Sequence, residues 1–165
     1  MEKPTISVVA HNIRSSHNIG SLFRTCDGFG VEHLYLSGYT PYPHTDNDQR
    51  LPHIVEKIAA DIHKTALGAE HTVAFSHIDH IENTIEAFKA HGYHIVGLEQ
   101  DSAATALPEY SPPHKILLLL GEEVNGLDDA LKKRCDDLIE IPMSGEKESF
   151  NVSVAAGIAL YGLSY

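Results

Sequence analysis

The sequence predicts an α/β fold: a mostly parallel sheet of six strands with helices on both faces. Short apolar runs alternate with amphipathic stretches along the 165 residues, and this alternation is typical of strands joined by crossover helices. Residues 116–120 are apolar without interruption, as expected of a central strand that is covered on both faces. Because the length suits one hydrophobic core, we expect residues 1–165 to form a single domain.

Six segments have the apolar or β-branched character of strands between turn residues. They are residues 6–9, 34–36, 72–75, 93–98, 115–120 and 138–141. Two long polar segments separate some of them, residues 38–52 and residues 101–114. Long loops of this kind in a compact domain are usually functional or mobile.

The remaining segments have helical signals. An apolar stripe at helical spacing runs from Ile78 to Phe88. Residues 128–134 carry acidic side chains first and basic ones last, the order that complements a helix dipole. Residues 151–163 are apolar on nearly every side, so this helix is expected to be buried on several faces or to lie in a subunit interface.

The composition favours a cytoplasmic protein that does not enter a membrane. The amino terminus lacks the basic and apolar regions of a signal peptide, and the longest apolar run is too short to cross a bilayer. Without a secretory signal, Cys26 and Cys135 are expected to be reduced core residues.

The charge is distributed unevenly. The net charge of −11 argues against a large non-specific surface for polyanions. Residues 1–70 carry six basic and eight acidic side chains, for a net charge of −2, while residues 71–165 carry six and fifteen, for −9. The first part of the chain could therefore still face a nucleic acid, and its six histidines would add positive charge if phosphate raised their pKa values.

A first group of candidate functional residues lies in residues 11–27. Asn18 is a suitable N-cap for a helix whose apolar stripe follows it and which Gly28 and Gly30 end. Arg24 lies well off that stripe at ~100° per residue, so it points away from the core. A capping Asn18 and a solvated Arg24 would also explain both residues without a function.

A second group, Gly-Glu-Glu-Val-Asn-Gly at residues 121–126, directly follows the most apolar strand. A glycine there lets a ligand approach the backbone at the carboxyl edge of an open α/β sheet. An ordinary strand-to-helix turn is the alternative. Spacing excludes two nucleotide motifs, because the chain has no G-x-x-x-x-G-K-[ST] and residues 28–33 lack the third glycine of the dinucleotide fingerprint.

A third group comprises Ile-Pro-Met-Ser-Gly at residues 141–145 and the polar start of the last helix at residues 149–153. Ser149 and Asn151 can cap that helix, or its free N–H groups can accept polar ligand atoms. Capping explains one of them, but it explains less well why Ser149, Asn151 and Ser153 all precede an apolar helix. No metal site is expected, since the His77/His80 and His91/His94 pairs have no third ligand nearby.

Together these groups resemble the three motifs of the SpoU/TrmH-type RNA ribose 2′-O-methyltransferases, within the SPOUT group. The family motifs are Asn, five residues, then Arg; Gly-x-Glu-x-x-Gly; and Ile-Pro-Met followed by Ser-Leu-Asn-Val-Ser. The matching residues are Asn18 and Arg24, then Gly121, Glu123 and Gly126, then residues 141–143 and 149–153. Phe150 stands where leucine is commoner, which should change packing beside the cofactor without abolishing binding.

The resemblance implies a SPOUT fold, with a deep trefoil knot at the carboxyl end, and an obligate homodimer with its active site near the interface. S-adenosylmethionine would be the methyl donor and RNA the substrate. Transfer RNA is the first expectation for that RNA and ribosomal RNA the second, and this chain would carry no separate RNA-binding extension. A non-catalytic protein that binds RNA or S-adenosylmethionine is the alternative. A SPOUT enzyme that methylates a base fits less well, because such enzymes have different motif residues.

The resemblance also assigns site residues. The catalytic set is Arg24, Asn18, Glu123, Ser149 and Asn151. The cofactor set is Leu119, Gly121, Glu122, Gly126, Ile141, Met143, Phe150 and Asn151. Arg14 and Arg24 would contact RNA. By family analogy Arg24 contacts the phosphate beside the target ribose, and because a guanidinium is a poor base, an electrostatic role is favoured over general-base catalysis.

Overall fold

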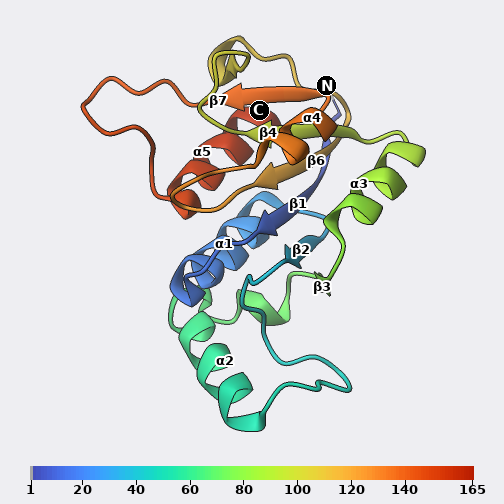
Figure 1. Cartoon of the computed structure of the whole chain (residues 1–165), viewed down its shortest axis with the longest axis vertical. Helices are drawn as coiled ribbons and strands as arrows, with labels where there is room; N and C mark the ends of the chain where they lie inside the picture. Colours follow the sequence, from blue (N-terminus) through green and yellow to red (C-terminus); the bar gives the residue numbers. More distant parts are fainter. Residues whose placement is uncertain (1) are drawn as a thin grey trace.

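A seven-stranded parallel sheet forms the centre of the protein (Figure 1). The structure is a computed structural model and describes residues 2–165. The strands lie in the order β3-β2-β1-β6-β4-β7-β5, and every neighbouring pair is parallel. Their bounds are β1 (Thr5–His11), β2 (Leu34–Ser37), β3 (Phe75–Ile78), β4 (His94–Leu98), β5 (Thr105–Ala106), β6 (Lys115–Leu120) and β7 (Asp137–Glu140).

The number of strands corrects the expected six. The seventh strand, β5, is a two-residue edge strand that pairs with β7, in a segment expected to be a loop. β3 begins at Phe75 and not at Thr72, because residues 69–71 form a 3₁₀ turn, η1 (Ala69–His71). The Thr72 hydroxyl then donates to Asp27 Oδ1 at 2.7 Å, which ties this turn to the end of the first helix.

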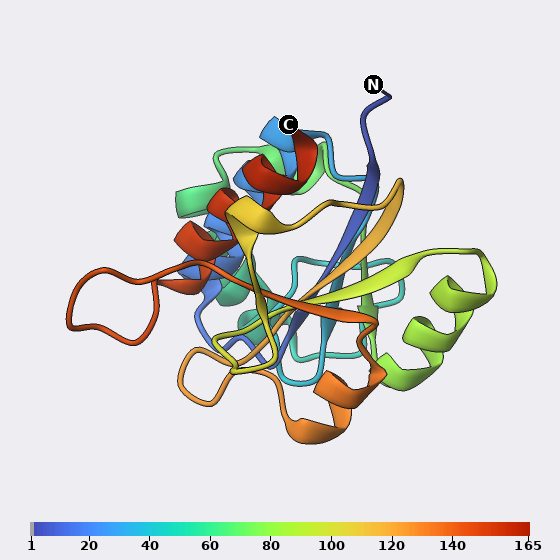
Figure 2. The same ribbon diagram turned by 90° about the horizontal axis from the view of Figure 1, so that it is seen from above.

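Helices cover both faces of the sheet, as predicted (Figure 2). On one face lie α1 (Ser16–Phe29), α2 (Pro52–Ala66) and α5 (Val152–Ser164), and on the other α3 (Ile81–Ala90) and α4 (Asp129–Arg134). β6 contributes to both cores: Ile116, Leu118 and Leu120 face the first set, while Leu117 and Leu119 face the second. Its unbroken apolar run therefore reflects burial on both sides.

The sequence patterns did not indicate α2. Only Val55, Ile62 and Ala66 of its 15 residues are buried, so its apolar signal is weak. α2 packs very closely on α1 at Gly20, where an added Cβ would lie 2.2 Å from the carbonyl oxygen of Ile62. This close crossing of the two helices requires a residue without a side chain at position 20.

The start of α1 also differs from the prediction. Its N-cap is Ser15, whose hydroxyl oxygen accepts the backbone N–H of Asn18 at 3.2 Å. Asn18 therefore lies in the first turn of the helix, and its side chain is available for other contacts. The helix continues through Gly28, which was also expected to end it, and stops at Gly30, a left-handed residue with φ of 65°.

Both cysteines are free, as predicted: Cys26 is buried and Cys135 is half-buried. Burial raises the pKa of the Cys135 thiol to about 12 and that of Cys26 further still, so neither is poised to react as a thiolate. Among residues 2–165, none of the helices combines the length and apolar character that crossing a bilayer requires.

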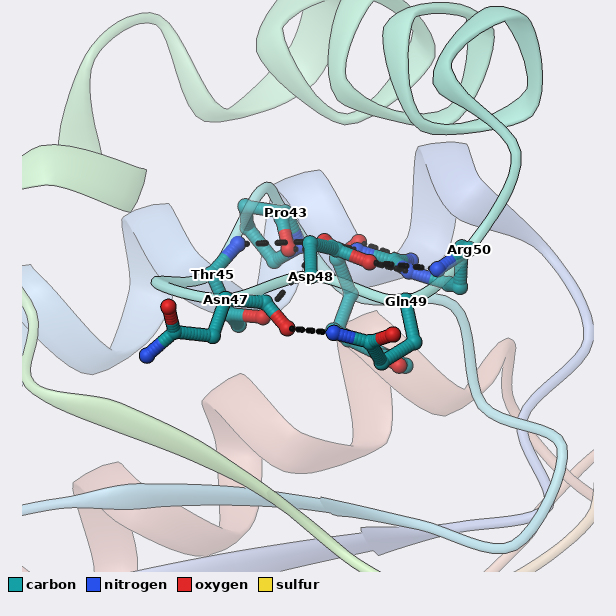
Figure 3. A network of polar contacts seen from close by, with 7 residues as sticks. Pro43, Thr45, Asn47, Asp48, Gln49 and Arg50 are labelled. Atoms are coloured by element: carbon teal, nitrogen blue, oxygen red, sulfur yellow. Dashed lines mark hydrogen bonds and ion pairs between the residues drawn. The ribbon is translucent and has the colours of Figure 1, made fainter.

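The long segment between β2 and α2 is held at its far end by one arginine (Figure 3). The Arg50 guanidinium donates to both carboxylate oxygens of Asp48, at 3.0 and 2.7 Å, and to the carbonyl oxygens of Tyr42 and Pro43, each at 2.9 Å. Asp48 also accepts the backbone N–H of Thr45 at 3.2 Å. These bonds give the segment a defined shape without regular secondary structure.

Candidate active site

The carboxyl ends of β4, β6 and β7 meet at a cleft, the edge at which open α/β sheets bind ligands. The enclosed part of the cleft measures about 110 Å³, and the space grows to about 650 Å³ when the open mouth is included. The loops after the three strands and the start of α5 form its walls. The lining residues are Leu98, Glu99, Gln100, Leu120, Gly121, Glu122, Glu123, Val124, Gly126, Ile141, Ser149, Phe150, Val152 and Ala155.

Most residues expected to bind the cofactor lie in this cleft. They are Gly121, Glu122, Gly126, Ile141 and Phe150. The other three lie elsewhere. The Leu119 side chain is fully buried in the core beneath α3 and α4, and Met143 and Asn151 are outside the lining. Because Leu119 faces the opposite side of the sheet, only its backbone could contribute to the cleft.

The turn that follows β6 requires glycine at both ends. An added Cβ on Gly121 would lie 2.4 Å from the carbonyl carbon of Gly126. Gly126 has φ of 66°, a left-handed conformation that favours glycine, and its N–H donates to the Glu122 carbonyl oxygen at 2.9 Å. The backbone itself therefore forms this wall of the cleft.

Glu99 and Gln100 are cleft residues that the sequence patterns missed. Glu99 Oε2 accepts the backbone N–H of Leu127 at 2.7 Å and lies directly beneath Gly126. Gln100 Nε2 donates to the Ile141 carbonyl oxygen at 2.7 Å, which joins the loops after β4 and β7. Their position directly after a strand, at the edge where ligands bind, is the signal that could have identified them.

Glu123 joins the cleft to the start of α1. Its Oε2 accepts the backbone N–H of Arg14 at 3.3 Å, and its Oε1 accepts from the Ser15 backbone and from Asn18 Nδ2, each at 3.5 Å. Asn18 Oδ1 in turn accepts from Asn151 Nδ2 at 3.2 Å. Hydrogen bonds thus connect residues from all three motif segments. We call Asn18, Glu123 and Asn151 the polar network.

Asn151 also caps α5, as the sequence indicated. Its Oδ1 accepts the Ser153 backbone N–H at 3.0 Å and the Ser153 hydroxyl at 2.7 Å. The same side chain therefore fixes the helix start and reaches Asn18, and capping does not compete with its place in the polar network. Ser149 lies nearby in the cleft lining and is exposed.

The two arginines expected to contact RNA are exposed and lie outside the polar network. The Arg14 guanidinium carbon lies 5.9 Å from the centre of the Tyr39 ring. Arg24 projects from α1, and within residues 2–165 its side chain forms neither an ion pair nor a hydrogen bond, so nothing in the described chain joins it to Asn18. The structure therefore brings Asn18, Glu123 and Asn151 together but leaves Arg24 apart from them.

One further cluster contains possible metal ligands. The side chains of His63, Glu70 and His71 place ligand atoms within 4.8 Å of one another, at the end of α2 and in η1. Glu70 is buried, but its carboxylate is already bound: one oxygen pairs with His63 Nδ1 and the other accepts the Gly68 N–H at 2.9 Å. These bonds account for the cluster as a structural contact that closes the helix end.

α5 has an uncovered apolar face. Val154, Tyr161 and Tyr165 are 50%, 63% and 82% exposed, respectively. A shallow hollow between α5 and α1 continues this face and includes Thr25 and Phe29. Exposed apolar patches on proteins often mark interaction surfaces.

A parallel α/β sheet with a cleft at its carboxyl edge is the arrangement in which open α/β proteins bind their ligands. The chain belongs to the SpoU rRNA Methylase family, whose model matches residues 5–161. This confirms the resemblance found in the three motifs. The family uses S-adenosylmethionine as its methyl donor.

Among curated proteins, the chain is 32% identical over 161 residues to the 23S rRNA (guanosine-2′-O-)-methyltransferase RlmB of Nitrosomonas europaea, with 98% of this chain and 56% of the relative covered. It is 29% identical to a putative TrmH family tRNA/rRNA methyltransferase of Staphylococcus haemolyticus, with 93% and 56% covered. The chain thus spans about half the length of these relatives.

Solved structures agree with the fold. An AdoMet-bound rRNA methyltransferase from Sinorhizobium meliloti superposes with a TM-score of 0.80 at 21% identity, covering 98% of this chain and 56% of that one. A TrmH/SpoU tRNA modifying enzyme from A. aeolicus superposes with a TM-score of 0.77 at 27% identity, covering 98% and 76%.

Proposed function

We propose that this protein transfers a methyl group from S-adenosylmethionine to the 2′-hydroxyl of a ribose in RNA. The polar network carries the proposal, because it joins Asn18, Glu123 and Asn151 at the edge of the cleft. Transfer to a hydroxyl needs that oxygen aligned with the methyl group, and such alignment supplies much of the rate. The name of the Nitrosomonas relative states the same reaction for that protein.

The cleft suits S-adenosylmethionine, which has a flat aromatic adenine ring, a cationic sulfonium centre and a polar amino-acid end. Leu98, Val152 and Ala155 offer apolar surface, while Glu99 and the backbone beside Gly121 offer polar groups. In our proposal the backbone groups of Gly121, Ile141 and Phe150 hold the donor. When bound, the donor supplies an electrophilic methyl group to the cleft.

The side chains around the cleft would hold the RNA. Arg14 and Arg24 are exposed cations that form no ion pair within residues 2–165, so both are free to bind phosphate. Glu123 would keep the Arg14 backbone and Asn18 in place, and Asn18 would orient the ribose. Ser149 and Asn151, at the start of α5, would support the substrate and the methionine end of the donor.

Ribosomal RNA is the substrate that we place first. Several relatives act, by their names, on 23S rRNA, while others are named for tRNA/rRNA; the sequence alone suggested transfer RNA. Transfer RNA remains the second candidate, in keeping with the name of the A. aeolicus structure. Mapping ribose methylation in rRNA and tRNA from cells with and without this chain distinguishes the two.

A homodimer completes the proposal. The exposed face of α5, at Val154 and Tyr161, is apolar enough to pack against a second copy. Arg24 precedes Thr25, which lines the hollow beside that face, so a partner there would approach Arg24. Sedimentation should show a dimer for the wild type and a monomer without transfer activity for Val154→Asp. A fully active monomeric wild type would contradict this arrangement.

The trefoil knot is also part of the proposal. β7 lies between β4 and β5 in the sheet, and α5, which follows it, packs beside α1. The connecting segment, residues 141–151, extends as a long open loop in both views (Figures 1 and 2). We treat residues 1–165 as one SPOUT domain that acts in the cytoplasm.

Two measurements test the reaction itself. Calorimetry should detect binding of S-adenosylmethionine, and a donor with a tritiated methyl group should label ribosomal or transfer RNA at a ribose. Donor binding without labelling of either RNA would favour the alternative, a non-catalytic binding protein. Labelling confined to bases would overturn the proposed position of transfer.

A further inference from the structure

A second hollow, of about 400 Å³, lies beside the loop that joins β1 to α1. Two arginine–tyrosine pairs line it: Arg50 with Tyr42, and Arg14 with Tyr39. The hollow is separate from the cofactor cleft, with which it shares no lining residue. The two pairs differ in whether the tyrosine ring and the guanidinium remain available to a ligand.

The pair of Arg50 and Tyr42 is closed. The Arg50 guanidinium carbon lies 3.5 Å from the centre of the Tyr42 ring, and His77 stacks on the same ring at 4.1 Å and 19°. Two groups this close to one ring centre cannot share a face, so both faces of the ring are covered. Four of the five N–H groups of the guanidinium already donate to Asp48 and to two carbonyl oxygens. This pair therefore shapes the wall and leaves little for a ligand.

The pair of Arg14 and Tyr39 is open. Tyr39 is 51% exposed, and the Arg14 guanidinium carbon stays 5.9 Å from the ring centre, well beyond stacking distance. Within residues 2–165 the Arg14 side chain has no hydrogen-bond acceptor and no carboxylate partner. The tyrosine ring is therefore available for stacking, and the cation beside it is available for an anion.

The backbone holds this open pair in a fixed position. Asn12 Oδ1 accepts the Tyr39 N–H at 3.1 Å, and the Ile13 N–H donates to Thr40 Oγ1 at 3.0 Å. Asn12 and Gly38 both have positive φ, of 53° and 64°, and an added Cβ on Gly38 would lie 1.8 Å from Asn12 Oδ1. The loops that carry Arg14 and Tyr39 thus form one unit, built around backbone conformations that are costly for most residues.

The same unit is joined to the cofactor cleft. Glu123, which lines the cleft, accepts the Arg14 backbone N–H at 3.3 Å. A ribose held at the polar network would therefore have its neighbouring nucleotide near Arg14. A protein with net charge −11 has few cations to spare for phosphates, so base stacking is a suitable second source of affinity.

We propose that Tyr39 and Arg14 form a site for one unpaired nucleobase of the RNA, next to the methylated nucleotide. The base stacks on Tyr39, and Arg14 binds the phosphate beside it. The inference rests on the proposed function for its choice of RNA as ligand, and it adds a specific residue, Tyr39, that recognises a base flanking the target.

Binding of short oligonucleotides tests this without methyl transfer. The probes are a fluorescein-labelled oligoadenylate RNA and a strand of the same length built from abasic residues. The variant Tyr39→Ala loses one base–aromatic stack. It should therefore bind oligoadenylate more weakly than the wild type, by roughly 5- to 100-fold. Binding of the abasic strand should not change, and Tyr39→Phe should restore most of the loss because it keeps the ring. Arg14→Ala should weaken both probes.

Leu51→Ala is the matched control, since Leu51 is a 58% exposed apolar residue in the same segment but outside the hollow. The inference is overturned if Tyr39→Ala binds oligoadenylate like the wild type, or if it loses both probes equally, which would indicate a structural role. Tritium transfer by the wild type is measured separately. Absence of methyl transfer would count against the proposed reaction. The stacking site would still be tested, by whether Tyr39→Ala loses binding of oligoadenylate but not of the abasic strand.

Discussion

The two halves of the sheet offer different surfaces for the two proposed ligands. Around β4, β6 and β7 the backbone itself forms a cleft, with Gly121 and Gly126 packed too tightly to admit side chains. Around β1 and β2, exposed side chains such as Arg14, Arg24 and Tyr39 project outward. A small ligand is enclosed by close backbone, whereas a polymer needs groups that reach into solvent. Glu123 of the cleft joins the two surfaces through its hydrogen bonds to Arg14 and Asn18.

The largest effect is expected for Arg24→Ala, which removes an exposed cation from the RNA half. Methyl transfer should fall by about 10²- to 10³-fold, the scale for losing one charge-stabilising group. Binding of S-adenosylmethionine should be unchanged, because Arg24 lies outside the cleft. Single-turnover transfer and calorimetry measure the two quantities. Turnover like that of the wild type would refute a role for Arg24, and Arg24→Lys tests whether charge alone suffices.

A smaller loss is expected for Glu123→Ala, which removes the hydrogen bonds from the cleft to the start of α1. The variant removes the acceptor of the Arg14, Ser15 and Asn18 donors, and misplaced substrate groups can lower rates by up to about 10²-fold. We expect kcat to fall by about 10- to 100-fold with a smaller change in donor affinity. Glu123→Gln keeps one carbonyl acceptor, so its kcat should lie between those of the wild type and Glu123→Ala. An unchanged kcat would show that the two halves work without this contact.

Gly126→Ala tests the cofactor half. The added Cβ would lie 2.0 Å from Glu99 Oε2 at a φ of 66°, and the left-handed conformation alone costs about 1–2 kcal/mol for a residue with a side chain. Donor affinity should fall by about tenfold or more, while binding of RNA oligonucleotides stays near the wild-type value. If RNA binding falls as much as donor binding, the two surfaces are not separable.

The smallest effect is expected from pH at Asp48. A side-chain hydrogen bond from Arg50 holds the pKa of Asp48 well below its usual range. The ionised carboxylate therefore stabilises the fold above the unfolded pKa of about 3.9, and this contribution is lost as the pH falls through the lower folded value. Asp48→Asn should melt earlier than the wild type at pH 7, and the difference should shrink below about pH 4. A difference that stays constant down to pH 3 would contradict the pairing.

Local patterns predicted much of this molecule and failed at identifiable places. β6 and the glycine stop of α1 were predicted because their signals lie within a few residues. α2 was missed because few of its residues are buried. Asn18 was assigned as the helix cap, but Ser15 occupies that position. Both residue types favour caps, so a choice between candidates three positions apart depends on packing that the pattern does not contain.

The parallel α/β class, the three motif segments and the family follow from the sequence, because periodicity and motif spacing are properties of neighbouring residues. The partners of those segments follow from the tertiary structure. Glu123 meets Asn18, Glu99 lies beneath Gly126, and Tyr39 stands open beside Arg14 while Tyr42 is covered. These contacts join residues that are distant in the chain, and such contacts exist only after the sheet brings the strand ends to one edge.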